Sequence, residues 1–218
     1  NVCHTVASEI YPGGIMSKLY EECHRELHDR FDTRRLADRM EGTLVHDTLT
    51  PDEQAYIAER DMFFIATVDA RGHVNCGYRG GEPGFVRTVD ERTIAFPNYD
   101  GNGMYLSMGN VLDASEVGIL FIDFENRKRM RYNGTATIDF DDPLKAEFPE
   151  AQFVVRVKAR EIFVNCPRYV HKMKVVERSR FVPKSGVVTP VPSWKTSEWA
   201  ADALAENDPA RDPKREVL

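Results

Sequence analysis

The feature that most constrains the fold is a series of short apolar segments in the middle of the chain, each closed by a tight turn. MFFIATVDARGHVNC predicts two strands joined at Asp69–Gly72, and FVRTVDERTIAF repeats this arrangement around Asp90–Arg92. VGILFIDFENRKRMRYNGTATID predicts another pair with a turn near 125–126, and QFVVRVKAREIFV (152–164) predicts a last strand. About six short antiparallel strands with such turns favour a closed or nearly closed barrel.

The strand after the third turn shows the two-residue period of a sheet most clearly. One face is predicted to carry Met130, Tyr132, Ala136 and Ile138, and the other Arg129, Arg131, Asn133 and Thr135. The sequence leaves open whether the two arginines form a basic groove wall or the solvated face of their strand.

Helical patterns precede the strands. Ser17 is a predicted N-cap for a helix whose apolar residues recur at helical spacing as far as Phe31. TRRLADRME predicts a second helix, with Leu36 and Met40 facing inward.

Two further helix starts are marked by capping residues. In TPDE, Thr50 caps the helix, Pro51 takes its first position and Glu53 closes a capping box. In DDPLKAEF, Asp142 followed by proline predicts a short capped helix.

These patterns divide the chain into four predicted parts. Residues 1–15 are a cloning remnant or a flexible arm, with Met16 as a candidate natural start. Residues 16–60 form a helical segment and residues 61–192 the barrel, while residues 193–218 form a polar surface tail with a short helix around SEWAADALA.

Bulk charge and cysteine usage exclude several classes of protein. The net charge of −6 and the pI near 5.6 argue against a nucleic-acid-binding protein that relies on bulk charge. The four cysteines form no CxxC pair, which favours a reduced cytoplasmic protein. The sequence shows no signal peptide, and no apolar run reaches the roughly 18 residues that a membrane span needs.

Local motifs point to neither metal binding nor nucleophilic catalysis. The cysteine and histidine pairs lack the spacing of a zinc site, so no metal is expected. The chain has no GxSxG elbow and no cysteine in a nucleophile signature. No catalytic residue can be named from the sequence.

Two glycine-rich stretches remain as candidate binding sites, and the first is YRGGEPGFVR (78–87). The guanidinium of Arg79 suits a pair of phosphate oxygens, and Gly80 and Gly81 let the backbone lie against a flat ligand. A wide glycine turn beside a solvated arginine would show the same pattern.

The second stretch is NYDGNGMYLSMGN (98–110), which leads into a helix predicted over roughly 103–113. The free N–H groups at such a helix start favour an anion, although an irregular turn is the alternative. Both stretches flank one pair of strands, so a shared ligand that is flat and carries a phosphate is the favoured interpretation.

The run that begins RDMFFIATV and ends NGTATI resembles the pyridoxamine 5′-phosphate oxidase-like, FMN-binding split-barrel family. IFVNCPRYVHKM (162–173) resembles the C-terminal signature of one branch, and the resemblance covers about residues 17–192. It implies a mainly β, α+β fold, with a six-stranded antiparallel split β-barrel, N-terminal helices and short peripheral helices. It also implies a homodimer in which each FMN lies in a groove formed by both chains.

The resemblance also implies a set of cofactor-binding residues: Arg79, Gly80, Asn98, Tyr99, Asn102, Ser107, Asn110 and Arg168. Arg79 matches the family arginine that contacts the cofactor phosphate. The family's Ser-Arg-Lys phosphate segment corresponds here to YLSMGNV, which leaves Ser107 and the nearby asparagines as neutral substitutes. The strand end at 98–99 would run along the isoalloxazine, and Arg168 is a candidate for reaching a flavin edge, including across the dimer.

Three functional interpretations follow from the resemblance. The leading one is an FMN-dependent oxidoreductase acting on a small-molecule substrate that the sequence does not identify. The second is a non-catalytic carrier or sensor of flavin or of another flat cofactor, such as haem or deazaflavin. The third is a structural dimer with an empty groove.

Overall fold

The computed structural model describes residues 17–218. The predicted arm at 1–15 and the candidate start Met16 lie outside the described residues. The chain divides into two compact units, of which the first ends at His46 and the second comprises Asp47–Leu218. Each unit is described by itself.

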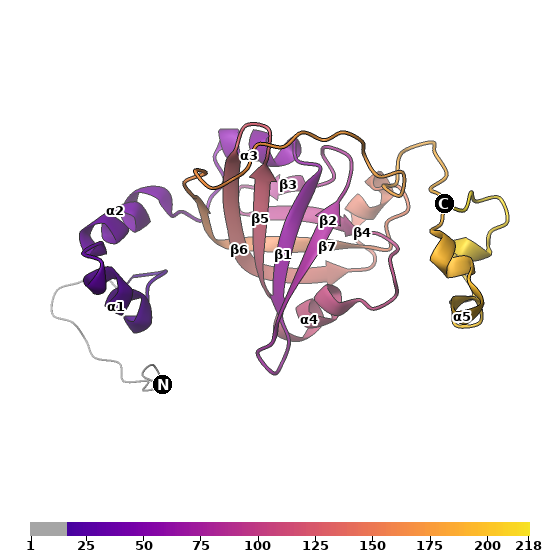
Figure 1. Ribbon diagram of the computed structural model, residues 1–218, viewed down its shortest axis with the longest axis horizontal. Coiled ribbons are helices and arrows are strands. Elements are labelled where there is room, and N and C mark those ends of the chain that lie inside the picture. Colours follow the sequence, from indigo (N-terminus) through magenta and orange to yellow (C-terminus); the bar gives the residue numbers. More distant parts are fainter. Residues whose placement is uncertain (1–16) are drawn as a thin grey trace. The chain divides into compact units, whose positions relative to one another are not determined.

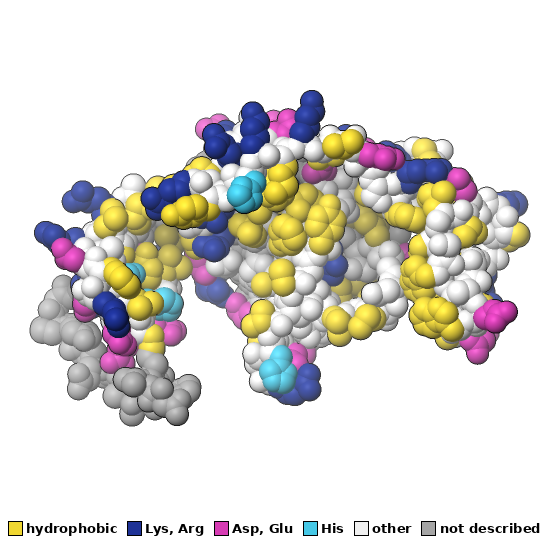
Figure 2. All heavy atoms as spheres, viewed as in Figure 1, with side chains coloured by type: hydrophobic (Ala, Val, Ile, Leu, Met, Phe, Trp, Pro, Cys, Tyr) yellow, Lys and Arg dark blue, Asp and Glu magenta, His cyan; other side chains and the backbone are white. Residues whose placement is uncertain are grey.

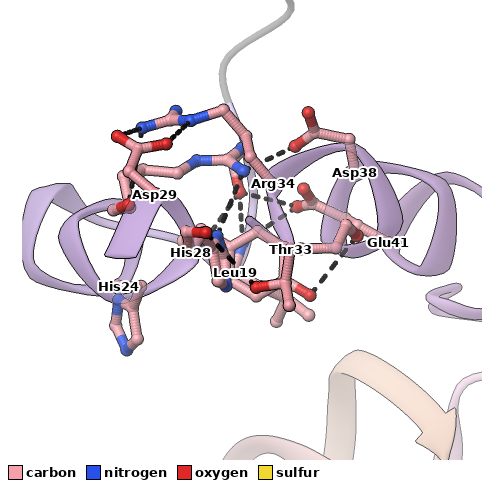
Figure 3. Close-up of polar contacts among 12 residues, drawn as sticks. Leu19, His24, His28, Asp29, Thr33, Arg34, Asp38 and Glu41 are labelled. Atoms are coloured by element: carbon pink, nitrogen blue, oxygen red, sulfur yellow. Dashed lines mark hydrogen bonds and ion pairs between the residues drawn. The ribbon is translucent and has the colours of Figure 1, made fainter. Parts of the chain in front are cut away.

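The described part of the first unit is a pair of helices, α1 (Glu22–Arg30) and α2 (Arg34–Leu44). Figure 3 shows the polar contacts within it, including the Arg34 guanidinium against the Asp29 carboxylate, at 2.5 and 2.6 Å. A second ion pair joins Arg25 to Asp38 at 2.5 Å.

Two predictions about this unit are wrong. Ser17 does not cap α1, because its hydroxyl accepts hydrogen bonds from the Leu19 and Tyr20 N–H groups in a separate turn and donates to Glu41. Leu36 and Met40 do not face inward: they are 59% and 42% exposed. The reason is that neither helix has a buried residue, so the described part of the unit, from residue 17 on, forms no interior to receive them.

The second unit is built on one antiparallel sheet of seven strands in the order β2-β1-β5-β6-β7-β4-β3 (Figure 1). The strands are β1 (Met62–Val68), β2 (Val74–Gly80), β3 (Arg87–Asp90), β4 (Thr93–Asn98), β5 (Glu116–Asp123), β6 (Lys128–Asp139) and β7 (Phe153–Val164). The predicted count of six was one too low, because the three strand pairs and the last strand marked by the sequence patterns already make seven, and the structure has all seven. Edge strands β2 and β3 are not hydrogen-bonded to each other, as befits a split barrel.

Apolar side chains fill the inner face of this sheet. Phe63 is fully buried, and its ring lies 4.9–5.6 Å from those of Phe85, Phe96 and Phe121. The predicted inward face of β6 is confirmed, since Met130, Tyr132 and Ala136 are buried and Ile138 packs against the core. The core therefore fixes the register of the strands.

The opposite face of β6 holds the segment that follows β7. Arg129 donates to the Cys166 carbonyl and Arg131 to the Asn165 side chain, each at 2.8 Å. Both arginines thus make local structural contacts.

Helix α3 (Pro51–Ala58) begins as the TPDE motif predicts. The Thr50 hydroxyl accepts from the Glu53 N–H at 3.3 Å, and the Glu53 carboxylate accepts from the Thr50 N–H at 2.9 Å. Helix α4 (Leu106–Ala114) lies beside the β1–β2 hairpin (Figure 1) and starts three residues later than predicted.

The C-terminal segment is mostly exposed, and one buried lysine ties it to the barrel. It contains η2 (Ser193–Thr196), α5 (Glu198–Ala201) and η3 (Pro209–Arg211). Lys195 is only 2% exposed, and its ammonium donates to Asp100 at 2.6 Å and to Asp208 at 2.9 Å. Burial opposes this charge, but the two hydrogen bonds outweigh it and raise the pKa of Lys195.

A buried ion pair gives the barrel a testable pH dependence. The fully buried Asp142 carboxylate caps η1 (Pro143–Glu147) through the Leu144 N–H and accepts from the Arg156 guanidinium at 2.5 and 3.0 Å. The hydrogen bond from Arg156 lowers the pKa of Asp142. In the unfolded chain the pKa of this carboxyl is about 3.9. The ion pair therefore stabilises the fold in full above about pH 4, and this stabilisation is lost as the pH falls through the lower pKa of the folded state.

We therefore expect Asp142→Asn to flatten the fall in the free energy of unfolding below about pH 4. Urea denaturation at several pH values measures the free energy of unfolding. The control is Asp141→Asn, since Asp141 is the exposed neighbour of Asp142. If Asp142→Asn retained the wild-type slope, the proposed linkage would be wrong.

Within residues 17–218, no helix is both long and apolar enough to span a membrane. In the same described part of the chain, no group of three or more histidine, cysteine, aspartate or glutamate side chains is arranged to hold a metal ion.

Candidate functional site

A cavity of about 250 Å³ lies between strand β2 and the chain from the end of β4 to the start of α4. It is the place where the two glycine-rich stretches meet. Five of the eight predicted binding residues line it: Arg79, Asn98, Tyr99, Asn102 and Ser107.

Strand β2 supplies one wall of this cavity through Asn75, Gly77 and Arg79, which share one face of the strand. A Cβ atom placed on Gly77 would lie 3.0 Å from Ser107 Oγ and 3.8 Å from Arg79 Nη1. Glycine therefore keeps open the space between the arginine and the serine.

The charge of Arg79 has no counterion in the described part of the chain. Its Nη1 donates to the Tyr78 carbonyl at 3.2 Å, while its Nε is buried without a hydrogen-bond partner. Burial lowers the pKa of the guanidinium, because the charged form loses hydration with no carboxylate to compensate. An anion in the cavity would compensate the charge of the guanidinium.

The first turn of α4 forms the facing wall. Tyr105 takes a left-handed conformation (φ 47°) before the helix, and its side chain makes no cap hydrogen bond. The next three residues, Leu106, Ser107 and Met108, line the cavity, and N–H groups in a first turn have no intrahelical acceptor. The positive end of the helix dipole favours an anion on the same side as Arg79.

Two predicted residues mainly shape this wall. The Ser107 hydroxyl accepts from Asn75 Nδ2 at 3.0 Å, which ties α4 to β2. The Asn102 side chain accepts from the Met104 N–H at 3.1 Å and so sets the turn before the helix.

The far end of the cavity is fixed by the end of β4. The Asn98 amide donates to the Gln152 side chain at 2.9 Å and to the Tyr99 carbonyl at 3.1 Å. The Tyr105 hydroxyl donates to the same Gln152 oxygen at 3.1 Å. Burial raises the pKa of Tyr99 to about 12, so its phenol stays neutral at physiological pH.

Three predicted residues do not line the cavity. Gly80 pairs with Met62 at the end of β2. Asn110 donates to Thr67 Oγ1 at 3.0 Å. Arg168 is exposed, with its guanidinium carbon 5.4 Å from the centre of the Tyr169 ring.

The sequence analysis missed Asn75 and Gly77, which complete the β2 wall. The signal was present, since the two-residue period of β2 places both on the face of Arg79. The resulting site has one cation, a helix start and neutral hydrogen-bonding groups, which suits a ligand with an anionic group and a flat uncharged part.

Comparisons with known proteins agree with this fold. A sequence profile described as pyridoxamine 5′-phosphate oxidase matches residues 49–180. No curated protein sequence matches the chain. This is the family that the run from RDMFFIATV to NGTATI and the segment IFVNCPRYVHKM resemble.

Solved structures with similar folds include three bacterial proteins. HupZ of Group A Streptococcus is 20% identical and is matched over 58% of this chain and 99% of its own, with a TM-score of 0.44. An FMN-binding protein of Syntrophomonas wolfei is 14% identical over 66% and 96%, with a TM-score of 0.41. HutZ, the heme storage protein of Vibrio cholerae, is 18% identical over 54% and 94%, with a TM-score of 0.40.

The profile match at residues 49–180 spans more than half of the chain and includes all seven strands of the sheet. The chain belongs to the pyridoxamine 5′-phosphate oxidase family.

Proposed function

We propose that this protein binds FMN in the Arg79 cavity and is an oxidoreductase acting on a small-molecule substrate. The observation that carries the proposal is Arg79 itself, a cation that lines the cavity without an ion-pair partner in the described chain and with its Nε unsatisfied. A ribityl phosphate would supply the missing acceptor oxygens.

The residues present fit this cofactor. Arg79 and the first turn of α4 would hold the phosphate, and Gly77 leaves room between them. Tyr99 and the 98–102 backbone would lie against the isoalloxazine. FMN supplies the electron-transfer chemistry when bound, and the protein contributes position, charge and exclusion of water.

We also propose a homodimer with the cofactor site at the subunit interface. Its support is a set of exposed apolar side chains, here called the rim, made of Val74 on β2 and Met104, Leu106 and Leu112 around α4, of which Met104 and Leu106 also line the cavity. Hydrophobic side chains also gather over β1, β2 and β5 in Figure 2. Exposed apolar surface of this kind is typical of protein interfaces. In such a dimer, Arg168 of one chain would reach the flavin bound by the other chain.

This dimer predicts that Leu112→Glu, which places a charge on the rim, shifts the protein toward monomer by at least tenfold in the dimer dissociation constant. Analytical ultracentrifugation measures the shift. Val188→Glu is the matched control, because Val188 is 63% exposed, close to the 68% of Leu112, and belongs to the C-terminal segment and not to the rim. A wild-type protein that sediments as a monomer would contradict the proposal.

The second candidate is a non-catalytic carrier of flavin or of another flat cofactor. The observation that favours it is that the described residues lining the cavity include no histidine, aspartate or glutamate, the commonest general acids and bases. A carrier would use the same binding residues as the oxidoreductase but would catalyse no turnover of a substrate.

Two measurements separate these candidates. The visible spectrum of the purified protein distinguishes flavin bands from the Soret band of haem. Steady-state consumption of NADH and NADPH by FMN-loaded protein then tests turnover. Consumption above that of free FMN supports an oxidoreductase, whereas retained FMN without consumption favours a carrier. Protein that takes up no FMN would overturn both flavin assignments.

A further inference from the structure

A second cavity, of about 280 Å³, adjoins the Arg79 cavity. Tyr99, Gly101 and Asn102 line both, so the loop after β4 forms their common wall. A molecule in the second cavity would thus lie across this loop from a cofactor in the first.

Most of the remaining wall comes from the C-terminal segment, beyond the end of the family profile match at residue 180. It brings two aromatic residues, Phe181 and Trp194, together with several prolines. Trp194 directly precedes Lys195, whose ammonium is fixed by Asp100 and Asp208, so its ring is held in place. The wall is largely apolar, as in sites for small ring compounds.

The charges around this second cavity are balanced, unlike the isolated charge of Arg79. Arg215 donates to the Glu150 carboxylate at 3.0 Å, and Asp100 is paired with Lys195 at 2.6 Å. A charged ligand would be desolvated there with no free counterion, so an uncharged ligand is favoured.

One polar group in the cavity wall lacks a partner. Thr189 is only 9% exposed, and its hydroxyl makes no hydrogen bond within the described chain. Its carbonyl and N–H are already occupied by Arg215 and Glu150, at 2.9 and 3.3 Å. The hydroxyl donor is therefore unused, and because its oxygen is itself buried, it would reach a ligand acceptor by rotation of the side chain about χ1.

We propose that the second cavity binds a flat, uncharged ring compound carrying a hydrogen-bond acceptor such as a carbonyl. Its volume is near the lower limit of about 300 Å³ for ligand pockets, which suits one or two fused rings. The further assignment of this compound as the substrate class rests on the proposed flavin function, because the shared 99–102 wall places it next to the cofactor cavity.

The test uses coumarin, a flat uncharged bicyclic lactone, and coumarin-3-carboxylate, which differs from it by one anionic group. Isothermal titration calorimetry on full-length FMN-free protein is expected to show coumarin binding at least tenfold more tightly than the carboxylate. Trp194→Ala should weaken coumarin binding about tenfold, the effect of one lost aromatic contact. Phe181→Ala, on another part of the wall, should weaken it as well.

Trp199→Ala is the matched control. Trp199 stacks on Trp194 at 6.0 Å but does not line the cavity, so its loss should change coumarin affinity less than twofold. Absent coumarin binding, equal affinity for both probes, or unchanged affinity in both wall variants would each overturn the proposal. FMN titration of the same samples separates the binding claim from the substrate claim. If coumarin bound and FMN did not, the second cavity would still be a ring-binding site, but its assignment as a substrate pocket would be wrong.

Discussion

Replacing Arg79 with alanine is expected to raise the dissociation constant for FMN about 10- to 100-fold. A hydrogen bond to a charged group contributes about 1.5–3 kcal/mol, and Arg79 is the one cation among the described residues that line the cavity. The N–H groups of the α4 first turn would remain, so binding should weaken rather than vanish. Fluorescence titration of FMN measures the change.

Arg71→Ala is the control for this experiment. It removes the same charge from the β1–β2 hairpin, but Arg71 is exposed and paired with Asp69 at 2.6 Å. Its effect on FMN affinity should stay within about twofold, as expected for a screened surface charge. Equal losses in the two variants would mean that Arg79 acts only through net charge, and no loss in either would remove Arg79 from the site.

Truncating Phe63 to alanine is expected to lower the free energy of unfolding of the barrel by about 3–5 kcal/mol. Phe63 is fully buried among Phe85, Phe96 and Phe121, so the substitution removes buried apolar area and leaves a cavity that the surrounding strands can close only in part. Urea denaturation followed by circular dichroism measures the loss.

Phe64→Ala is a matched comparison one residue along the same strand. Phe64 points to the other face of β1, where it is only partly buried and meets the ring of Tyr78 at 5.9 Å. We expect its truncation to cost about 1 kcal/mol in the monomeric barrel. If the two variants lost equal stability, the assignment of the inner face of β1 would be wrong.

Local patterns were sufficient to predict most of the barrel. The turns at 69–72 and 90–92 and the capping box at Thr50 depend on residues a few positions apart, and the structure has them where predicted. The count of six was too low although the local patterns marked seven segments, because it was taken from the barrel that the family resemblance implied and not from the segments themselves. The inward placement of Leu36 failed because amphipathic spacing does not reveal whether a helix has anything to pack against.

The site was predictable in part for the same reason. Glycines and a lone arginine mark the two stretches that meet around Arg79, and Ser107 lies beside it as the motif implies. Asn75 and Gly77 were missed because their role appears only when β2 faces α4. The wall around Trp194 could not be predicted, because it depends on Lys195 reaching Asp100, a contact across ninety-five positions of the chain.

The central claim is that the Arg79 cavity holds the phosphate end of FMN. The most direct test compares the dissociation constants of FMN and of riboflavin, which lacks the phosphate, for wild-type protein and for Arg79→Ala. We predict that wild-type protein binds FMN at least about tenfold more tightly than riboflavin, and that this advantage is largely lost in the variant. Equal affinity of wild-type protein for the two flavins, or an advantage that persists without Arg79, would contradict the claim.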